Sequence, residues 1–372
     1  MCRTTSRLGY LDNLRIFVTI LVVAHHAGQA YGPTGGDWPI FEEVRAPWLL
    51  PFFATNAAWF MGLFFLLSGY FTPASFDRKG AKAFLKDRFV RLGLPIVLFW
   101  SPILGIYEYR AAQTEQSFVT WFVTDYVLGA NMEVGHLWFL VHLLFYSLAY
   151  AAWRRWRGSA TTAGTAAPTT GQLVAYGLAL TVVTYLVRIG FPIDRWIWIA
   201  GVFPSEVAHL PQYLSLFFIG ITAGRNRWFE TISARFGLQL FGIAIALVAF
   251  VYLYLLVIRN YVSFGFETGG PSWGSFRYSL LEAAICISMC LGLPVFFREA
   301  LNRQNDFLKQ LAAGAYTVYI IHFLILVTIQ GLLLRFALSP TTKFAVATLT
   351  ATALCFLCAH LLRKVPGLTR VL

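Results

Sequence analysis

Long apolar runs dominate this sequence and leave few folds open to it. The chain of 372 residues is 58% hydrophobic and only 12% charged, whereas a soluble domain carries about 25% charged residues. Ten runs approach the roughly 17–25 apolar residues that cross a bilayer as a helix. We therefore predict an all-α, polytopic transmembrane helical bundle that forms one domain over residues 1–372. The predicted spans are 14–31, 55–72, 92–109, 136–153, 172–189, 210–223, 238–258, 276–297, 311–334 and 344–362.

Lys and Arg are distributed unequally between the two sides of this bundle. If the N-terminus is cytoplasmic, 21 of the 29 Lys and Arg residues fall on the inner segments, as expected from the positive-inside rule. This predicts an N-in/C-in topology, with ten spans and a flexible cytoplasmic linker at 157–171. The basic spacing of 73–91 is consistent with an interfacial amphipathic helix. The net charge of +12 is explained by basic residues on the inner segments and does not require a nucleic-acid partner. We therefore expect the lipid bilayer as a partner and no nucleic acid.

The first apolar run contains a cation at its inner edge and two imidazoles well inside it. Arg15 and His26 are eleven positions apart, which is about three helical turns, so their side chains share one helix face roughly 16 Å apart. His25 points about 100° away from that line. A charge at the membrane edge and a titratable ring near mid-depth suggest a reaction that spans half a bilayer. The alternative is a signal peptide, which the two histidines inside the apolar run disfavour.

Ionisable residues deep in a span are costly, which makes them functional candidates. His25, His26, His142, Glu282 and His322 lie within predicted spans. They belong to four spans at similar depth, so we predict a site in the centre of the bundle. The alternative for any single histidine is a ring satisfied by a backbone carbonyl, and this alternative is strongest for His142.

Arginines gather at the predicted inner face. Arg88 and Arg91 are three residues apart, so both guanidinium groups face one way on a helix. With Arg15 and Arg78 they form a candidate phosphate site, since arginine binds phosphate bidentately. The alternative is ordinary positive-inside charge. We expect no metal, because Cys355-x-x-Cys358 is a single pair in an apolar run.

Five motifs follow one another along nearly the whole chain. They are Arg15-x10-His26, Phe64-Phe-Leu-Leu-Ser-Gly69, Arg88-x-x-Arg91, His136-Leu-Trp-Phe-Leu140 and Tyr316-Thr-Val-Tyr-Ile-Ile-His322. In this order they resemble the acyltransferase-3 family of ten-span membrane acyltransferases. Within that family, the Leu-Ser-Gly-Tyr-Phe run and residues 86–95 are most similar to the glucan succinyltransferase branch.

The resemblance implies an acyl group taken from cytoplasmic acyl-CoA and placed on an extracytoplasmic hydroxyl of a carbohydrate or glycan. Acyl-CoA is then a co-substrate, and no permanently bound cofactor is expected. We expect His26 to act as general base, while a covalent acyl-histidine stays open, as does acetyl versus succinyl. The expected catalytic residues are His26, Ser68, Glu282 and His322; coenzyme A is expected at Arg15, Arg78, Arg88 and Arg91, and substrate at His25, His136, Trp138 and Tyr319.

Two other functional classes fit a polytopic chain with intramembrane histidines. A proton-coupled transporter would use the histidines as a relay, but no internal repeat is visible in the sequence. A non-catalytic scaffold would not explain why the chain places histidines and a carboxylate in the membrane, which is energetically costly. The predicted location is the bacterial inner (plasma) membrane, with the protein embedded as a multi-pass enzyme.

Overall fold

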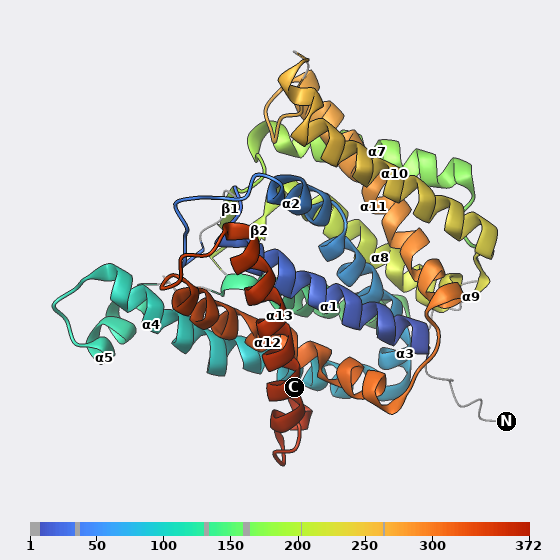
Figure 1. The fold of residues 1–372 in the computed structure, drawn as a ribbon. Coiled ribbons are helices and arrows are strands. Elements are labelled where there is room, and N and C mark those ends of the chain that lie inside the picture. Colours follow the sequence, from blue (N-terminus) through green and yellow to red (C-terminus); the bar gives the residue numbers. More distant parts are fainter. Residues whose placement is uncertain (1–7, 34–37, 130–133, 159–163, 202, 263–264) are drawn as a thin grey trace.

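Helices form almost all of the regular structure in the computed structural model, which describes residues 8–33, 38–129, 134–158, 164–201, 203–262 and 265–372 (Figure 1). This confirms the predicted all-α class. The long helices are α1 (Gly9–Gln29), α2 (Leu49–Ala57), α3 (Phe60–Arg88), α4 (Ser101–Ala112), α6 (Trp138–Arg157), α7 (Thr170–Gly190), α8 (Leu210–Arg225), α10 (Ala234–Leu256), α11 (Trp273–Ala300), α12 (Asp306–Leu333) and α13 (Pro340–Leu362). Short elements are α5 (Phe118–Trp121), α9 (Trp228–Thr231) and the strands β1 (Trp196–Ile199) and β2 (Phe203–Glu206).

Within the described residues, eight helical segments are long and apolar enough to cross a membrane. The helix α1 is not among them, because four ionisable residues interrupt its apolar sequence: Asp12, Arg15, His25 and His26. Each of the ten predicted spans nevertheless overlaps a helical segment. Leu186, Ile243 and Leu349 are exposed on α7, α10 and α13, as expected for helix faces covered by lipid. The number of crossings and the side of the termini remain predictions, and Arg3 and Arg7 lie outside the described residues.

Side-chain caps mark where several of these helices begin. The Ncap side chain accepts a hydrogen bond from a backbone N–H in the first turn, which satisfies a group that has no partner within the helix. At α7 the cap is reciprocal, since Thr169 and Gln172 form a capping box. The other capped long helices are α10 at Ser233, α11 at Ser272, α12 at Asn305 and α13 at Ser339.

The central helices pack around α1 and α3. The helix α1 packs against α11, α12 and α13, and α3 packs against α6 and α8. The helices α7 and α10 pack on α11 at one edge of the bundle, whereas α4 and α5 project from it on another side (Figure 1). Residues of α1, α3, α6 and α12 therefore face one another in the interior.

The C-terminal half of α3 departs from the predicted boundaries. The helix does not end at residue 72 but continues through Pro73, and Gly80 with a φ of 73° breaks its regular geometry. The segment 73–91 is thus the end of α3 and the start of a π-helical stretch, η1 (Phe89–Gly93). A second π-helical stretch, η2 (Pro95–Trp100), follows it. The predicted span 92–109 consists of these π-helical residues and α4.

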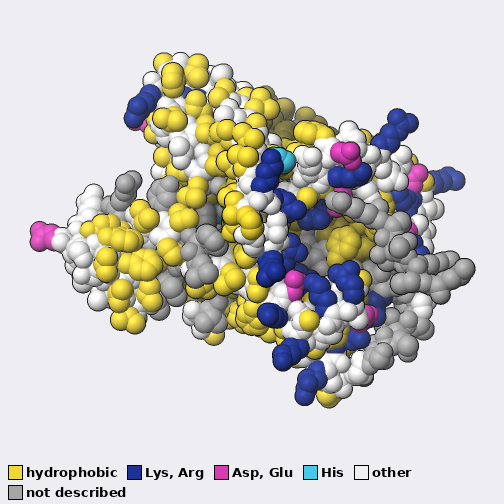
Figure 2. Space-filling model, turned by 90° about the horizontal axis from the view of Figure 1, so that it is seen from below, with side chains coloured by type: hydrophobic (Ala, Val, Ile, Leu, Met, Phe, Trp, Pro, Cys, Tyr) yellow, Lys and Arg dark blue, Asp and Glu magenta, His cyan; other side chains and the backbone are white. Residues whose placement is uncertain are grey.

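A two-stranded hairpin is the exception to the helical fold. Its strands β1 and β2 are antiparallel, with Trp196 opposite Glu206 and Ile199 opposite Phe203. It precedes α8 through a 3₁₀ turn, η5 (Val207–His209). Figure 2 shows Lys and Arg side chains gathered on part of one face beside a broad hydrophobic surface, which agrees with a protein that meets both lipid and water.

Candidate active site

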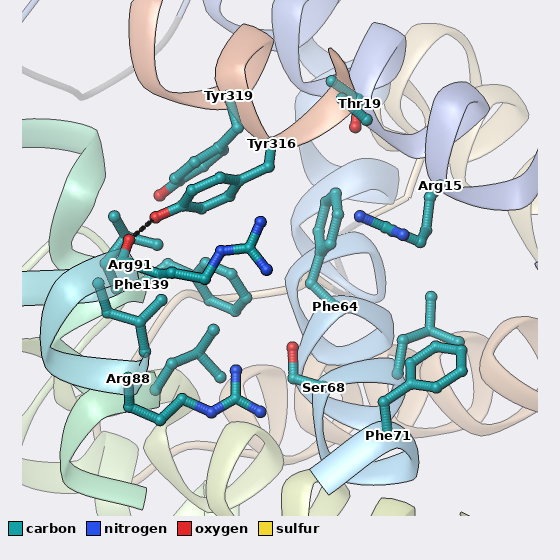
Figure 3. A pocket seen from close by; sticks show the side chains of 15 residues that line it. Arg15, Thr19, Phe64, Ser68, Phe71, Arg88, Arg91, Phe139, Tyr316 and Tyr319 are labelled. Atoms are coloured by element: carbon teal, nitrogen blue, oxygen red, sulfur yellow. Dashed lines mark hydrogen bonds between the residues drawn. The ribbon is translucent and has the colours of Figure 1, made fainter. Parts of the chain in front are cut away.

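A cavity of about 340 Å³ opens among α1, α3, η1, α6 and α12. It brings together residues from all five of the motifs found in the sequence. The polar side chains that line it come from Arg15, Thr19, Ser68, Arg88, Arg91, Tyr316 and Tyr319. Figure 3 shows the guanidinium groups of Arg15, Arg88 and Arg91 directed from different elements toward the same space. The predicted inner arginine site is therefore a single cavity, except for Arg78, which is exposed and does not line it.

The pair Arg88 and Arg91 lies where α3 passes into η1. The Arg88 guanidinium lies 4.9 Å from the centre of the Phe84 ring, so its stem is held against apolar surface. The hydroxyl of Tyr316 on α12 donates a hydrogen bond to the backbone carbonyl of Arg91 (Figure 3). This contact links α12 to the π-helical turn that carries Arg91.

Three histidines meet next to this cavity. The rings of His26 and His322 have centroids 4.9 Å apart, those of His136 and His322 4.5 Å, and those of His26 and His136 6.2 Å. They come from α1, the turn before α6, and α12. The predicted proximity of His26 and His322 is thus present in the structure, and His136 completes the cluster.

Hydrogen bonds indicate how the protons of His26 and His322 are arranged. A carbonyl can only accept, so the His322 Nδ1–H donates to the Tyr319 carbonyl at 2.7 Å. The His322 Nε2 then accepts, and it lies 3.1 Å from the His26 Nδ1. The His26 Nδ1 also lies 3.0 Å from the Val22 carbonyl and must carry the proton. In this arrangement a neutral His26 presents the lone pair of Nε2.

Tyr319 joins the cavity to the histidine cluster. Its ring lines the cavity, and its backbone carbonyl accepts hydrogen bonds from both His136 Nε2, at 3.0 Å, and His322 Nδ1. Its hydroxyl donates to the backbone carbonyl of His136. The side chain expected to bind substrate is therefore also the wall between the arginines and the histidines.

Trp38 and Gln330 belong to the same cluster, although sequence reasoning missed them. The Trp38 indole is stacked on the His26 ring, with centroids 5.5 Å apart and planes 22° apart. Its Nε1–H donates to Gln330 Oε1 at 2.7 Å, and Gln330 Nε2 donates to the Ala27 carbonyl at 3.0 Å. The sequence does not reveal this position of Trp38, because nothing in a loop sequence indicates which helix the loop folds over.

His25 and Trp138 have surroundings different from those expected for substrate-binding residues in this cluster. The His25 ring contacts His26 edge-on but otherwise lies among Phe52, Phe53 and Phe60. Trp138 is stacked on Tyr213, with centroids 5.4 Å apart. Both side chains support the walls around the histidines through aromatic packing.

Glu282 orients a histidine, but not one of the three in the cluster. Its carboxylate forms a buried ion pair with Arg188 of α7 and lies 3.4 Å from His209 Nε2. The other ring nitrogen of His209 lies 2.8 Å from Glu206 Oε2, so both N–H groups donate to carboxylates. Burial by itself would raise the pKa of Glu206, yet His209 and the Asp194 N–H hold it below its usual value. This network ties α7, α8 and α11 together.

His142 shows the structural alternative that the sequence left open. Its Nε2 lies 2.9 Å from the Pro204 carbonyl, and its ring stacks on Phe203 with centroids 4.0 Å apart. The imidazole therefore fastens β2 to α6. Among the described residues, no group of three or more His, Cys, Asp or Glu side chains is arranged to hold a metal ion.

Comparison with known proteins assigns the family. The model described as Acyltransferase domain matches residues 8–360. The chain belongs to the acyltransferase-3 family. It is also 25% identical over 335 residues to proteins named Glucans biosynthesis protein C from Salmonella typhi, Salmonella agona and Salmonella typhimurium, which covers 84% of this chain and 80% of each relative. No solved structure gives a significant match. The protein is thus an integral, multi-pass membrane acyltransferase, which disfavours the transporter and scaffold alternatives.

Proposed function

We propose that this acyltransferase moves a short acyl group, acetyl or succinyl, from cytoplasmic acyl-CoA to a hydroxyl of an extracytoplasmic carbohydrate. The observation that carries the proposal is the position of Tyr319 between two sites. On one side lies a cavity with three arginines, and on the other lie three clustered histidines. The relatives named Glucans biosynthesis protein C favour a glucan-type acceptor, and we place the enzyme in the bacterial inner membrane.

The arginine cavity suits the donor. Coenzyme A carries phosphates at one end and a thioester at the end of a long, thin arm. Arg15, Arg88 and Arg91 supply three guanidinium groups for the phosphates. The remaining wall contains Phe64, Phe139 and leucines, which suits an arm of low charge. In this arrangement the arm follows α1 toward the histidines.

His26 is the proposed general base. Its Nδ1–H is engaged by the Val22 carbonyl, so Nε2 takes the proton of the acceptor hydroxyl as the oxygen attacks the thioester carbon. The ester C–O bond forms and the C–S bond breaks. The coenzyme A thiolate then receives the proton from the His26 imidazolium, which restores the neutral ring. Ser68, the expected donor to the developing oxyanion, lines the arginine cavity instead, so in this mechanism it contacts the bound donor rather than the reacting carbonyl.

The other candidate donors to that oxyanion are already engaged. Tyr319 gives its hydroxyl hydrogen to the His136 carbonyl, and His322 gives its Nδ1–H to the Tyr319 carbonyl. These two side chains therefore fix the geometry around His26 in our mechanism. Glu282 has no direct part in this mechanism, because its partners are Arg188 and His209 rather than the three clustered histidines.

The decisive test uses purified protein in lipid nanodiscs with acetyl-CoA, succinyl-CoA and a glucan oligosaccharide. We expect free thiol to appear when the acceptor is present, and mass spectrometry to find the acyl group on the oligosaccharide. Quenching the reaction in the absence of acceptor distinguishes direct transfer from a covalent acyl-histidine. Only the covalent route adds the mass of the acyl group to the protein. Mass spectrometry of envelope glycans from cells with and without the gene would identify the natural acceptor. Unchanged glycans and intact thioesters would contradict the proposal.

A further inference from the structure

The loop between α1 and α2 places one aromatic side chain directly on His26. Trp38 is only 6% exposed, and its indole lies nearly parallel to the imidazole. The edge of Phe323 contacts the indole, with ring centroids 5.1 Å apart. The indole is thus packed between α1 and α12 rather than exposed as an interfacial anchor.

Several contacts hold this loop in place. Gln330 is fully buried and connects the Trp38 Nε1–H to the Ala27 carbonyl at the end of α1. Farther along the loop, the Glu42 N–H donates to the Ala30 carbonyl, and the Glu42 carboxylate forms an ion pair with Lys343 of α13. Because α1, α12 and α13 all hold the loop, the position of Trp38 is set by the fold.

These neighbours restrain the His26 ring in two ways. Contacts of Nδ1 with Val22 and His322 restrict rotation of the ring in its own plane. The indole face of Trp38 restricts motion perpendicular to that plane. A base held in this manner keeps one lone pair in one direction, which is what proton transfer from a positioned hydroxyl requires.

We propose that Trp38 is a positioning residue for the base, and that its indole face also stabilises the imidazolium that forms during transfer. The proposal rests on the proposed function, in which His26 gains a proton. Indole is the strongest of the aromatic cation acceptors, and the centroid separation of 5.5 Å lies within the range of this interaction. The stabilisation is larger for the protonated ring than for the neutral ring, so it favours the transition state over the ground state.

This role predicts a separation of turnover from donor binding. Trp38 is not among the residues that line the arginine cavity, so its loss should leave acyl-CoA affinity nearly unchanged. We expect Trp38→Leu to lower kcat about 3- to 30-fold, the range of a cation–π contact, with KM for acyl-CoA within about twofold. Trp38→Phe keeps an aromatic face and loses the hydrogen bond to Gln330, so it should recover part of the turnover.

The control comes from the same loop. Trp48 also donates its Nε1–H to a side chain, Thr341 at 3.0 Å, and packs edge-on against Phe344, but histidine is not its stacking partner. Trp48→Leu should therefore keep the parental kcat. The assay measures thiol release from succinyl-CoA or acetyl-CoA with a glucan oligosaccharide, at equal amounts of folded protein in nanodiscs.

The outcomes separate this inference from the function on which it rests. If Trp38→Leu keeps parental turnover while His26→Ala is inactive, Trp38 has no role in the reaction although the proposed function stands. An equal loss in Trp48→Leu would likewise overturn the inference, because it would show a general effect of the loop. If His26→Ala is itself fully active, the assignment of the base is wrong.

Discussion

At the scale of single residues, the two adjacent histidines of α1 have different surroundings. His26 contacts His322, Val22 and Trp38, whereas His25 lies among phenylalanines. We expect His26→Ala to lose about 10²- to 10⁴-fold in turnover, the usual contribution of a positioned base. Binding of acyl-CoA should persist, because the arginines proposed to hold its phosphates lie in the cavity. Acyl transfer and acyl-CoA affinity should be measured separately on the purified variant.

The matched variant is His25→Gln, which keeps a hydrogen-bonding group without a proton that titrates. It should retain transfer per folded molecule, although its yield can fall because the side chain is packed among aromatic rings. Loss of transfer in His25→Gln together with near-parental transfer in His26→Ala would reverse the two roles.

The arginine pair permits a test of the donor site. Replacing Arg88 and Arg91 with Ala should weaken acyl-CoA binding about ten- to hundred-fold for each lost phosphate contact, since a hydrogen bond to a charged group contributes about 1.5–3 kcal/mol. Lys at both positions should restore part of the affinity. It returns the positive charge but lacks the planar guanidinium group that binds phosphate through two hydrogen bonds. Calorimetric titration of the purified variants with acetyl-CoA measures both effects.

Arg78→Ala is the control for this experiment, since Arg78 is exposed and lies outside the cavity. If the variant lacking both Arg88 and Arg91 binds acetyl-CoA as tightly as the parent does, these residues serve topology alone and the donor site lies elsewhere.

Much of the candidate site could be predicted from the sequence, because the spacing of side chains along a helix is regular. The spacing of eleven between Arg15 and His26, and of three between Arg88 and Arg91, places side chains on predictable faces. The partners of Glu282 could not be predicted, because the depth of a residue in a span does not reveal which helix lies opposite it. Trp38 was missed for a related reason: its position depends on Gln330, almost three hundred residues away in the chain.

At the scale of elements, the packing of α3 on α8 depends on glycine. A Cβ atom built on Gly220 would lie 2.2 Å from the Leu66 carbonyl oxygen, and one on Gly69 would lie 2.1 Å from the Phe217 carbonyl oxygen. Both clashes are with backbone, which cannot move aside as a side chain can. The small residues therefore permit the close helix approach that is common in membrane bundles.

We predict that Gly220→Ala destabilises the protein by at least the 1–3 kcal/mol typical of overpacking. The measurement is thermal unfolding of the detergent-solubilised protein, followed by loss of the monodisperse peak in size exclusion. Gly242→Ala in α10 is the matched control, because its new Cβ would meet no atom within 4 Å. A melting temperature for Gly220→Ala equal to that of Gly242→Ala would show that the two helices can separate without cost.

Helix positions were predicted better than helix interruptions. Apolar runs of spanning length correspond to helical segments, because a buried or lipid-facing backbone must satisfy its own hydrogen bonds. The break at Gly80 and the π-helical turn at Phe89–Gly93 were not predicted. The turn depends on a distant partner, the Tyr316 hydroxyl that binds the Arg91 carbonyl. Interruptions of this kind are set by tertiary contacts and leave no local periodic signal.

At the scale of the whole molecule, the orientation of the bundle decides which side supplies the donor. We predict that residues 157–171 are cytoplasmic, because of the asymmetric distribution of Lys and Arg. A cysteine placed at Ala166 in a background without other cysteines should react with an impermeant maleimide only after the inner membrane is permeabilised. Labelling in intact spheroplasts would reverse the orientation and remove cytoplasmic acyl-CoA as the donor.

The helix α12 takes part in both sides of the proposed reaction, because its Tyr316 contacts Arg91, its Tyr319 contacts His136, and it carries His322. One helix therefore sets the distance between the arginine cavity, where the donor is proposed to bind, and the histidine cluster, where the acyl group is proposed to be transferred. For the function proposed here, such an enzyme has no need to rock between inward- and outward-facing states. In this proposal the flexible arm of the coenzyme is the part that moves, and the free energy released by cleaving its thioester drives transfer without an ion gradient.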